Sequence, residues 1–397
     1  MAADAERGAN GLTPRVLSPP ASPAAVHDKR VEPLELFFDL VFFFAITQVT
    51  ARLADDPSWT GLLQGGLVLS SIWWAWGAYA WLTNEVDTSR TAVRLTIVCS
   101  MAAMLVAGLA IPGALEADAW VFAASYFVVR ALHLALFVAG TDDVDVRRAV
   151  RTLAPTALLA PVVLLASSAL DGVPQVTLWV AALAVDYVGG GLRGIAGWRI
   201  SASHFAERHG LIIIIALGES IVAIGVGAAQ VALDRSTVGA AVLGMVVVAA
   251  LWATYFDGAP ERVQERLAAL SSGRDRNAAA RDAYSFLHLP MVAGIVLLAL
   301  GVKKALAHVH DPLDLVPAVA LCGGVAAYLL AQVAFRSRCG EPLERQRVAA
   351  AVLCAALVPL MTAMPAMVGL AVLAGVCTAL LAYESIQAHR STPKGSP

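Results

Sequence analysis

Two carboxylates stand at the start of one of the most apolar stretches of the chain. Glu35 and Asp39 are four residues apart and are followed by a run of Val, Phe, Ala and Ile. On a helix this spacing places both side chains on one face, about one turn apart. A carboxylate inside a membrane span normally faces a partner or a water-filled cavity, because lipid does not solvate it. Both residues are therefore candidate catalytic groups; the alternative is that they only cap a helix N-terminus.

Oxygen-bearing side chains recur at the ends of the neighbouring apolar segments, on the side where Glu35 lies. The candidate metal ligands are Asp39, Asn84, Asp87, Glu207 and Asp257. Carboxylates together with an amide suit Mg²⁺, which usually takes one or two carboxylates and the phosphates of its substrate. The sequence therefore predicts magnesium as the one candidate cofactor.

Cationic and imidazole side chains stand beside these oxygen donors. Arg90 and Arg208 suit a diphosphate, because guanidinium forks bind phosphate oxygens in pairs. His204 and His209 would line the same substrate site, but their spacing of five does not match the i, i+4 spacing of a helical zinc motif. Glu219, near the middle of its apolar segment, and His288 are the candidates for moving a proton.

Aromatic side chains form a further candidate part of a substrate site. Trp73 and Trp76 lie near the middle of an apolar segment, whereas membrane-surface belts hold Trp at segment ends. Tyr255 lies next to the candidate ligand Asp257. Aromatic faces around an apolar chamber stabilise a cation by about 0.5–2 kcal/mol each when it is desolvated. Ordinary helix packing is the alternative reading of these rings.

Composition identifies the class of protein. The chain has 397 residues, of which 58% are hydrophobic and 15% charged, against about 25% charged residues in soluble domains. The fold expected is all-α, a polytopic integral membrane protein whose main partner is the lipid bilayer. A net charge of −2 gives no indication of nucleic-acid binding. The five cysteines are scattered singly and are expected to act as small hydrophobic residues.

Apolar segments of about 20 residues predict about twelve transmembrane helices. They cover residues 33–54, 59–83, 91–113, 118–140, 148–170, 174–196, 209–231, 236–257, 284–306, 313–335, 346–363 and 365–386. The transmembrane domain is thus expected over 31–386, between a disordered tail at 1–30, without a cleavable signal peptide, and a second tail at 387–397. Similar stretches in the first and seventh segments suggest two parallel six-helix repeats.

Loop charge predicts the orientation in the membrane. The connections on one side contain 21 Lys and Arg residues, and those on the other side contain 4. Cytoplasmic loops carry the excess of positive charge. Both termini, and the candidate site near Glu35, are therefore expected on the cytoplasmic face of a bacterial inner membrane.

Several segments together resemble one bacterial family. They are Pro33-Leu-Glu-Leu-Phe-Phe-Asp39; Trp73-Trp-Ala-Trp with Asn84-Glu-Val-Asp87; His204-Phe-Ala-Glu-Arg-His-Gly210 running into Glu219-Ser220; Tyr255-Phe-Asp257; and Tyr284-Ser-Phe-Leu-His288. This pattern is similar to the low-temperature-requirement A family, LtrA, over about residues 31–386. The resemblance implies a many-span membrane fold and leaves the chemistry open. Glu85 and Val86 stand where the family usually carries an aromatic pair.

Three classes of function remain open: an enzyme, a transporter, and a protein that carries out neither reaction nor transport. A polar mouth on one side with an apolar chamber behind it favours an intramembrane enzyme for a prenyl or lipid diphosphate, of the terpene-cyclase or prenyltransferase type. Mid-depth carboxylates such as Glu219 and Asp186 suit a proton- or ion-coupled transporter instead. In the third reading the chain is a membrane-homeostasis protein needed for growth at low temperature. A small lipidic or ionic substrate is expected in the first two readings.

Overall fold

The computed structural model describes residues 31–141, 143–192, 201–257, 262–263, 265–266, 269 and 273–391. Throughout these residues the regular elements are helices, and no strand occurs among them. The expected all-α fold is thus confirmed. The predicted tail at 1–30 and residues 392–397 lie outside the described residues.

The first half of the chain forms six long helices. They are α1 (Pro33–Asp55), α2 (Trp59–Glu85), α3 (Thr91–Leu109), α4 (Ala119–Gly140), α5 (Val144–Ser167) and α6 (Gly172–Leu192), with the short 3-10 turn η1 (Ile111–Gly113) before α4. Local chemistry explains two of the helix starts. Glu32 and Glu35 form a capping box at the start of α1, and the Ser58 hydroxyl accepts a bond from the Gly61 N–H at the start of α2. Such caps satisfy N–H groups that a helix cannot bond internally.

The second half continues the pattern. Its elements are α7 (Ala202–Ala228), α8 (Arg235–Phe256), α10 (Gly273–Ala280), the π-helical segment η2 (Arg281–Phe286), α11 (His288–Ala307), α12 (Leu315–Arg338), α13 (Arg345–Ala356), α14 (Val358–Met361) and α15 (Ala366–Ser391). The eleventh predicted span, 346–363, is wrong as a single helix. It is broken at Leu357 into α13 and α14, and Pro359, which lacks an N–H to donate, lies in the first turn of α14.

Ten of the described helices are long and apolar enough to cross a membrane. The two remaining predicted spans correspond to α2 and α13. The 27-residue α2 has the length but carries many Trp, Ser and Gly residues, and α13 has only 12 residues. The protein is therefore a polytopic helical membrane protein, as the composition predicted.

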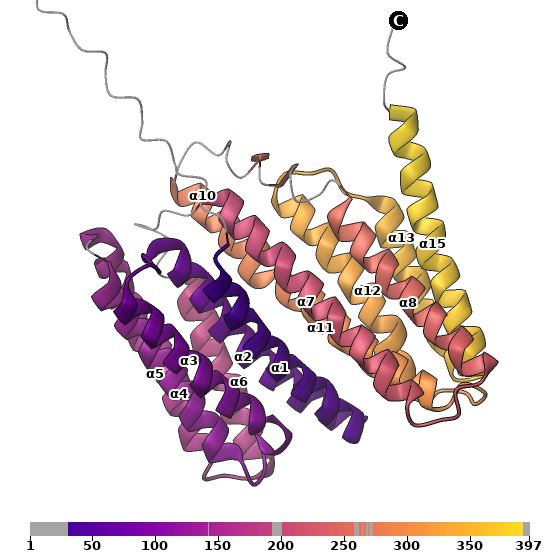
Figure 1. Cartoon of the computed structure of the whole chain (residues 1–397), viewed down its shortest axis with the longest axis horizontal. Helices are drawn as coiled ribbons and strands as arrows, with labels where there is room; N and C mark the ends of the chain where they lie inside the picture. Colours follow the sequence, from indigo (N-terminus) through magenta and orange to yellow (C-terminus); the bar gives the residue numbers. More distant parts are fainter. Residues whose placement is uncertain are drawn as a thin grey trace, which may run out of the picture.

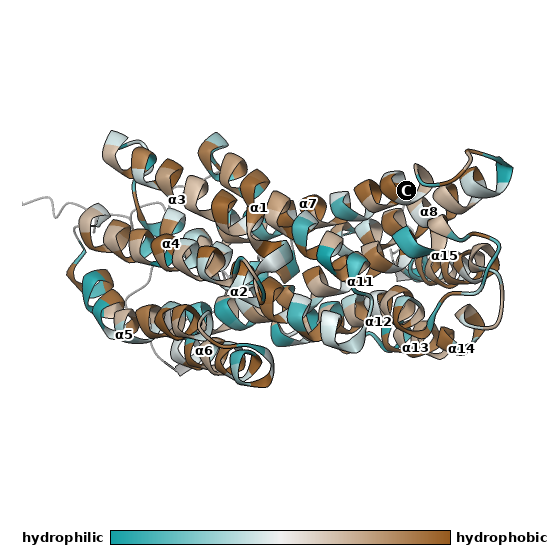
Figure 2. Ribbon diagram, turned by 90° about the horizontal axis from the view of Figure 1, so that it is seen from below, coloured by the Kyte–Doolittle hydropathy of each residue, from teal (hydrophilic) through white to brown (hydrophobic). Residues whose placement is uncertain are grey.

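The helices run side by side in one elongated bundle, with α3 to α6 at one end of its long axis and α8, α13 and α15 at the other (Figure 1). Hydrophobic residues cover much of the helix surfaces, as a lipid-facing surface requires (Figure 2). Along the helix axes, the start of α1 and the end of α15 lie on the same side of the bundle, at the top of Figure 1. Which side of the membrane this end faces stays a prediction.

The two halves pair their helices in the same order. In the first half α1 packs on α2 and α3, α3 on α4, α4 on α5, α5 on α6, and α6 on α2. In the second half α7 packs on α8 and α11, α11 on α12, α12 on α13, α13 on α15, and α15 on α8. This correspondence is the arrangement expected of two parallel six-helix repeats. The halves meet mainly where α1 lies against α7 and α11.

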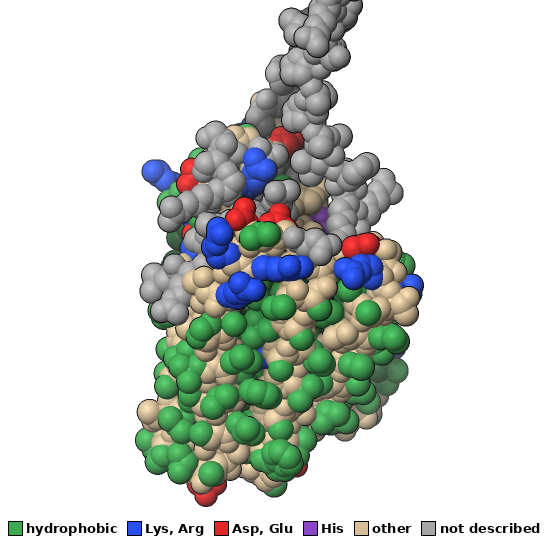
Figure 3. All heavy atoms as spheres, turned by 90° about the vertical axis from the view of Figure 1, so that its left-hand side faces the viewer, with side chains coloured by type: hydrophobic (Ala, Val, Ile, Leu, Met, Phe, Trp, Pro, Cys, Tyr) green, Lys and Arg blue, Asp and Glu red, His purple; other side chains and the backbone are tan. Residues whose placement is uncertain are grey.

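Positive side chains gather near one end of the bundle. On the face formed by the first half, Lys and Arg side chains lie in a band above a broad hydrophobic surface (Figure 3). The band lies at the end where α1 begins, as the loop-charge argument requires of the predicted cytoplasmic face.

Candidate functional site

Arg208 joins the two carboxylates that open α1. Its Nη1 donates to Glu35 Oε1 at 2.8 Å and to Thr83 Oγ1 at 2.6 Å, and its Nη2 donates to Asp39 Oδ1 at 3.0 Å. His204 Nε2 lies 3.0 Å from Glu35 Oε2. The predicted one-turn spacing on α1 is what allows one guanidinium on α7 to bridge both acids. The structure therefore brings together Glu35, Asp39, His204 and Arg208, as the candidate site required.

This cluster is closed. Arg208 and Glu35 are each 1% exposed and Asp39 is fully buried, and no water-sized space opens beside them. Asp39 Oδ1 also accepts a bond of 2.7 Å from the indole N–H of Trp76, whereas its Oδ2 has no partner. An Arg fork on two carboxylates offsets the large cost of burying these charges. In this arrangement the Arg208 fork is already occupied by protein carboxylates.

A series of rings in edge-to-face contact continues from this cluster toward α8 and α11. His209 lies between the rings of Trp76 and His288, with centroids 5.1 Å away on each side. His288 Nδ1 donates to the Ala283 carbonyl, so its Nε2 accepts the 2.9 Å bond from the Tyr255 hydroxyl. The carbonyl can only accept, and this fixes the tautomer. Four of the predicted substrate and proton groups, Trp76, His209, Tyr255 and His288, thus converge, but in a packed layer.

The other predicted metal ligands lie apart from Asp39, near the end of the bundle. Asn84 Oδ1 accepts from the Ser201 N–H, and Glu207 Oε2 from the Val31 N–H. Asp87, Arg90 and Asp257 are exposed at helix ends. Among the described residues, no group of three His, Cys, Asp or Glu side chains is placed to hold a metal ion. The predicted magnesium set is therefore not assembled here, and Mg²⁺ binding stays a prediction.

Glu219 lies apart from the Arg208 cluster and from the predicted metal ligands at the end of the bundle. It is 3% exposed about two-thirds of the way along α7, and its Oε2 has no hydrogen-bond partner. Thr50 of α1 and Lys303 of α11 are its polar neighbours. The structure thus leaves one predicted proton-handling carboxyl separate from the Glu35 cluster.

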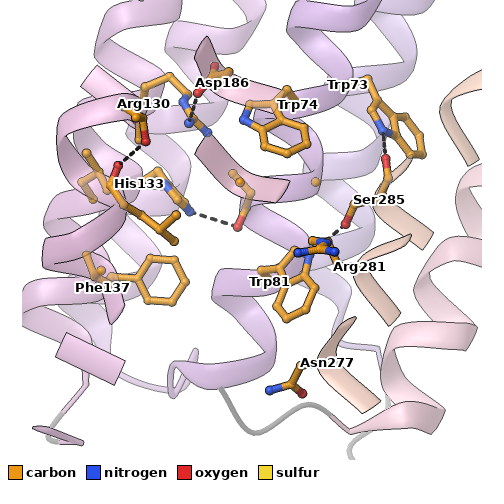
Figure 4. A pocket seen from close by; sticks show the side chains of 18 residues that line it. Trp73, Trp74, Trp81, Arg130, His133, Phe137, Asp186, Asn277, Arg281 and Ser285 are labelled. Atoms are coloured by element: carbon orange, nitrogen blue, oxygen red, sulfur yellow. Dashed lines mark hydrogen bonds and ion pairs between the residues drawn. The ribbon is translucent and has the colours of Figure 1, made fainter. Parts of the chain in front are cut away.

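A cavity of about 120 Å³ lies on the other side of α2 (Figure 4). Its walls come from α2, α4, α5, α6, α10 and η2. The lining residues include Trp73, Trp74, Gly77, Ala78, Trp81, Arg130, His133, Leu134, Phe137, Val150, Leu153, Thr156, Ala157, Asp186, Gly190, Asn277, Arg281 and Ser285. Most of the lining is apolar or aromatic, and the space is comparable to engineered cavities that hold a benzene molecule. Of the predicted site residues, Trp73 lines it, and so does Asp186, a candidate carboxylate of the transporter reading.

An ion pair is buried in the wall of this cavity. Arg130 Nη2 donates to Asp186 Oδ1 at 3.0 Å, and the Tyr126 hydroxyl donates to Asp186 Oδ2 at 3.2 Å. Both charged residues are 3% exposed. The sequence places Arg130 and Asp186 in different spans and gave no signal that they pair. The sequence showed only that each residue is a charge within an apolar segment. Such charges are rare, and each one is by itself a candidate for function.

The segment that joins α10 to α11 covers one side of the cavity. Trp73 Nε1 donates to the Ser285 carbonyl at 2.7 Å, and Trp81 Nε1 donates to the Ser285 hydroxyl at 3.0 Å. Ser285 lies in η2, and π-helical turns are frequent at functional sites. Arg281 of the same segment pairs with Asp282 and donates to the Gly191 carbonyl. These bonds hold η2 against α2 and α6.

The equivalent place in the second half is filled by an arginine. Arg347 of α13 donates to Gln332 of α12, to the Thr254 carbonyl of α8 and, through two bonds of 2.7 and 2.9 Å, to Glu384 of α15. One side chain thereby ties together the helices that correspond to α2, α4, α5 and α6. The repeat has diverged, with a cavity in one half and a buried ion network in the other.

Comparison with known proteins gives a family and no activity. The model of the family "Bacterial low temperature requirement A protein (LtrA)" matches residues 30–382. Uncharacterized protein RA0937 of Rhizobium meliloti (strain 1021) is 28% identical over 306 residues, which cover 74% of each chain. No solved structure matches the chain. The matched residues contain the Arg208 cluster and the cavity, and the chain belongs to the LtrA family of multi-pass bacterial membrane proteins.

Proposed function

We propose that this protein binds a lipidic molecule in the cavity between α2, α4, α5 and α6. The observation that carries the proposal is the cavity itself, an apolar space with a few convergent polar groups inside a membrane-spanning bundle. Such a space is the default candidate for a ligand site in an uncharacterised protein. The closed Arg208 cluster offers no comparable room.

The wall chemistry suits a hydrocarbon chain. The Trp74 ring stacks on Tyr187 and Phe286, with centroid distances of 4.4 and 5.8 Å. Trp73 and Trp81 donate their indole N–H groups to Ser285, which holds both rings in the wall. The part of an isoprenoid or acyl chain that enters this space would gain dispersion and burial on these rings, about 25 cal/mol for each Å² of apolar surface buried.

The proposal also includes a reaction on the diphosphate head group of a prenyl or lipid substrate. A terpene-cyclase or prenyltransferase reaction with Mg²⁺ at Asp39 would require the closed cluster to open, because Arg208 and Trp76 hold Oδ1 and the unpaired Oδ2 is fully buried. Binding of the chain and reaction of the head group are therefore separate questions. The experiment below tests them in separate arms.

The binding experiment replaces a glycine in the cavity wall with a larger residue. Gly77 lines the cavity, and a Cβ added there meets no atom within 4 Å. Gly77→Leu should therefore fill the cavity without disturbing the fold. Gly66→Leu on the exposed part of the same helix is the matched control, since a Cβ there also meets nothing within 4 Å.

The full-length protein in lipid nanodiscs would be titrated with farnesol and with farnesyl diphosphate, with and without Mg²⁺. Fluorescence of the cavity tryptophans reports binding, and extracts are screened for product. We expect binding to wild type and Gly66→Leu, and at least tenfold weaker binding to Gly77→Leu, whose unliganded melting temperature should stay at or above that of the wild type. Equal affinity in all three proteins would refute the cavity as the site. Product formed only with Mg²⁺ would support the enzyme reading.

One observation favours coupled transport as a second candidate. Glu219 is buried in a span with one carboxyl oxygen unpaired, and unpaired intramembrane acids occur in proton relays. Proton flux into liposomes that contain the wild type, and its loss in Glu219→Gln, would support this reading. Equal flux through both proteins and through empty liposomes would exclude Glu219 as a coupling site.

A further inference from the structure

Two polar atoms in the cavity wall have no partner. Arg130 gives one nitrogen to Asp186, but its Nε is buried without an acceptor. His133 Nε2 lies 3.0 Å from the Ala78 carbonyl and must donate to it, because a carbonyl only accepts. A neutral His133 then keeps a lone pair on Nδ1, which is also buried without a partner. Buried polar atoms are nearly always bonded, so unpaired ones point to a missing water or ligand.

The two residues belong to one face of α4. Their separation of three residues places them one above the other, on the side that lines the cavity. Figure 4 shows both side chains at this wall, with the Arg130–Asp186 pair beside Trp74. The two wall residues therefore carry one unpaired N–H donor and one unpaired lone-pair acceptor at neighbouring positions of α4.

The arginines that line the cavity already have carboxylate partners. Arg130 is paired with Asp186, whose second oxygen accepts from Tyr126. Arg281 is paired with Asp282 at 2.7 Å. A diphosphate would need positive charge that no carboxylate balances, whereas Arg130 faces Asp186 and Arg281 faces Asp282.

We infer that the cavity selects a ligand with an uncharged hydroxyl head, such as an isoprenoid or long-chain alcohol. The hydroxyl oxygen accepts from Arg130 Nε, and the hydroxyl hydrogen is donated to His133 Nδ1. A hydroxyl group carries both functions on one atom and so matches this donor and acceptor. The inference rests on the proposed function and adds the class of the head group.

The test compares three ligands that share one chain: farnesol, farnesyl methyl ether and farnesyl diphosphate. The ether accepts a hydrogen bond but donates none. Full-length protein in nanodiscs should bind farnesol about tenfold more tightly than the ether, and more tightly than the diphosphate. His133→Phe keeps an aromatic ring and removes the acceptor, so it should bind the ether as the wild type does and lose the preference for the alcohol.

Thr156→Val is the matched control. Thr156 also lines the cavity, but its hydroxyl is already bonded to the Leu153 carbonyl, so this variant should keep the full preference for farnesol. Equal binding of alcohol and ether, tighter binding of the diphosphate, or a preference that survives in His133→Phe would each overturn the inference. In those cases the proposed function still stands if Gly77→Leu binds the ligand at least tenfold more weakly than the wild type. If none of the three ligands binds the wild type, the proposed function fails together with the inference.

Discussion

Arg208 sets the charge balance of the buried Glu35 cluster. A single guanidinium faces two carboxylates, each at most 1% exposed. Removing one member of a buried ion pair leaves the other charge uncompensated, which typically costs about 3–5 kcal/mol. The two acids are not equivalent, because Asp39 also holds Trp76 whereas Glu35 also holds His204.

Substitutions in this cluster should differ sharply in cost. We expect Arg208→Met to lower the free energy of unfolding by about 3–5 kcal/mol, because Glu35 and Asp39 lose their shared cation. Asp39→Asn should cost only about 1–2 kcal/mol, since the amide oxygen still accepts from Trp76 and Arg208. Reversible denaturation in mixed micelles measures both values. Equal losses in the two variants would contradict this account of the cluster.

At the scale of elements, close approach of α6 to its neighbours shapes the cavity. A Cβ on Gly190 would lie 2.5 Å from the Trp74 ring, and one on Gly189 would lie 2.6 Å from the Thr156 hydroxyl. Glycines in membrane helices permit such close packing.

The neighbouring Gly191 supplies a control, because a Cβ there comes no closer than 3.8 Å to any atom outside its own helix. Gly190→Ala should displace Trp74, destabilise the protein by about 1–3 kcal/mol and weaken farnesol binding. Gly191→Ala should be neutral or stabilising by up to about 1 kcal/mol, the difference in helix propensity. Thermal unfolding with and without farnesol checks both variants. A Gly190→Ala protein as stable as Gly191→Ala would show that Trp74 is free to move.

At the scale of the whole molecule, the two halves share a pairing order but not an interior. Arg347 joins α8, α12, α13 and α15, and its side chain is buried. The corresponding helices of the first half surround the cavity instead. If function lies in the cavity, it belongs to the helices of the first half and to η2, which the second half contributes.

Orientation belongs to this scale, and it can be tested with cysteines at two exposed positions. In a Cys99→Ala background, Ala232→Cys lies between α7 and α8, and Ser89→Cys lies between α2 and α3. A membrane-impermeant maleimide applied to intact cells should label the first and spare the second, because the loop-charge rule places Ser89 in the cytoplasm. Permeabilised cells, in which both should react, are the control. Labelling of Ser89→Cys alone would reverse the predicted orientation.

The sequence by itself determined the class, the helices and part of the site. Apolar length depends only on local composition, so it located helices that the structure confirms, apart from the break at Leu357. The i, i+4 spacing of Glu35 and Asp39 predicted one shared face, and Arg208 and His204 were already candidates. These inferences succeed because helix geometry relates spacing to direction.

Only the tertiary structure decided which distant side chains meet. It paired Arg208 with both acids, it paired Arg130 with Asp186 across 56 positions of sequence, and it placed the cavity behind α2. Neither pairing follows from composition, since apolar spans resemble one another and their order along the chain does not fix their neighbours in the bundle. The packing of whole helices determined whether a buried charge became a closed ion pair or part of a cavity wall.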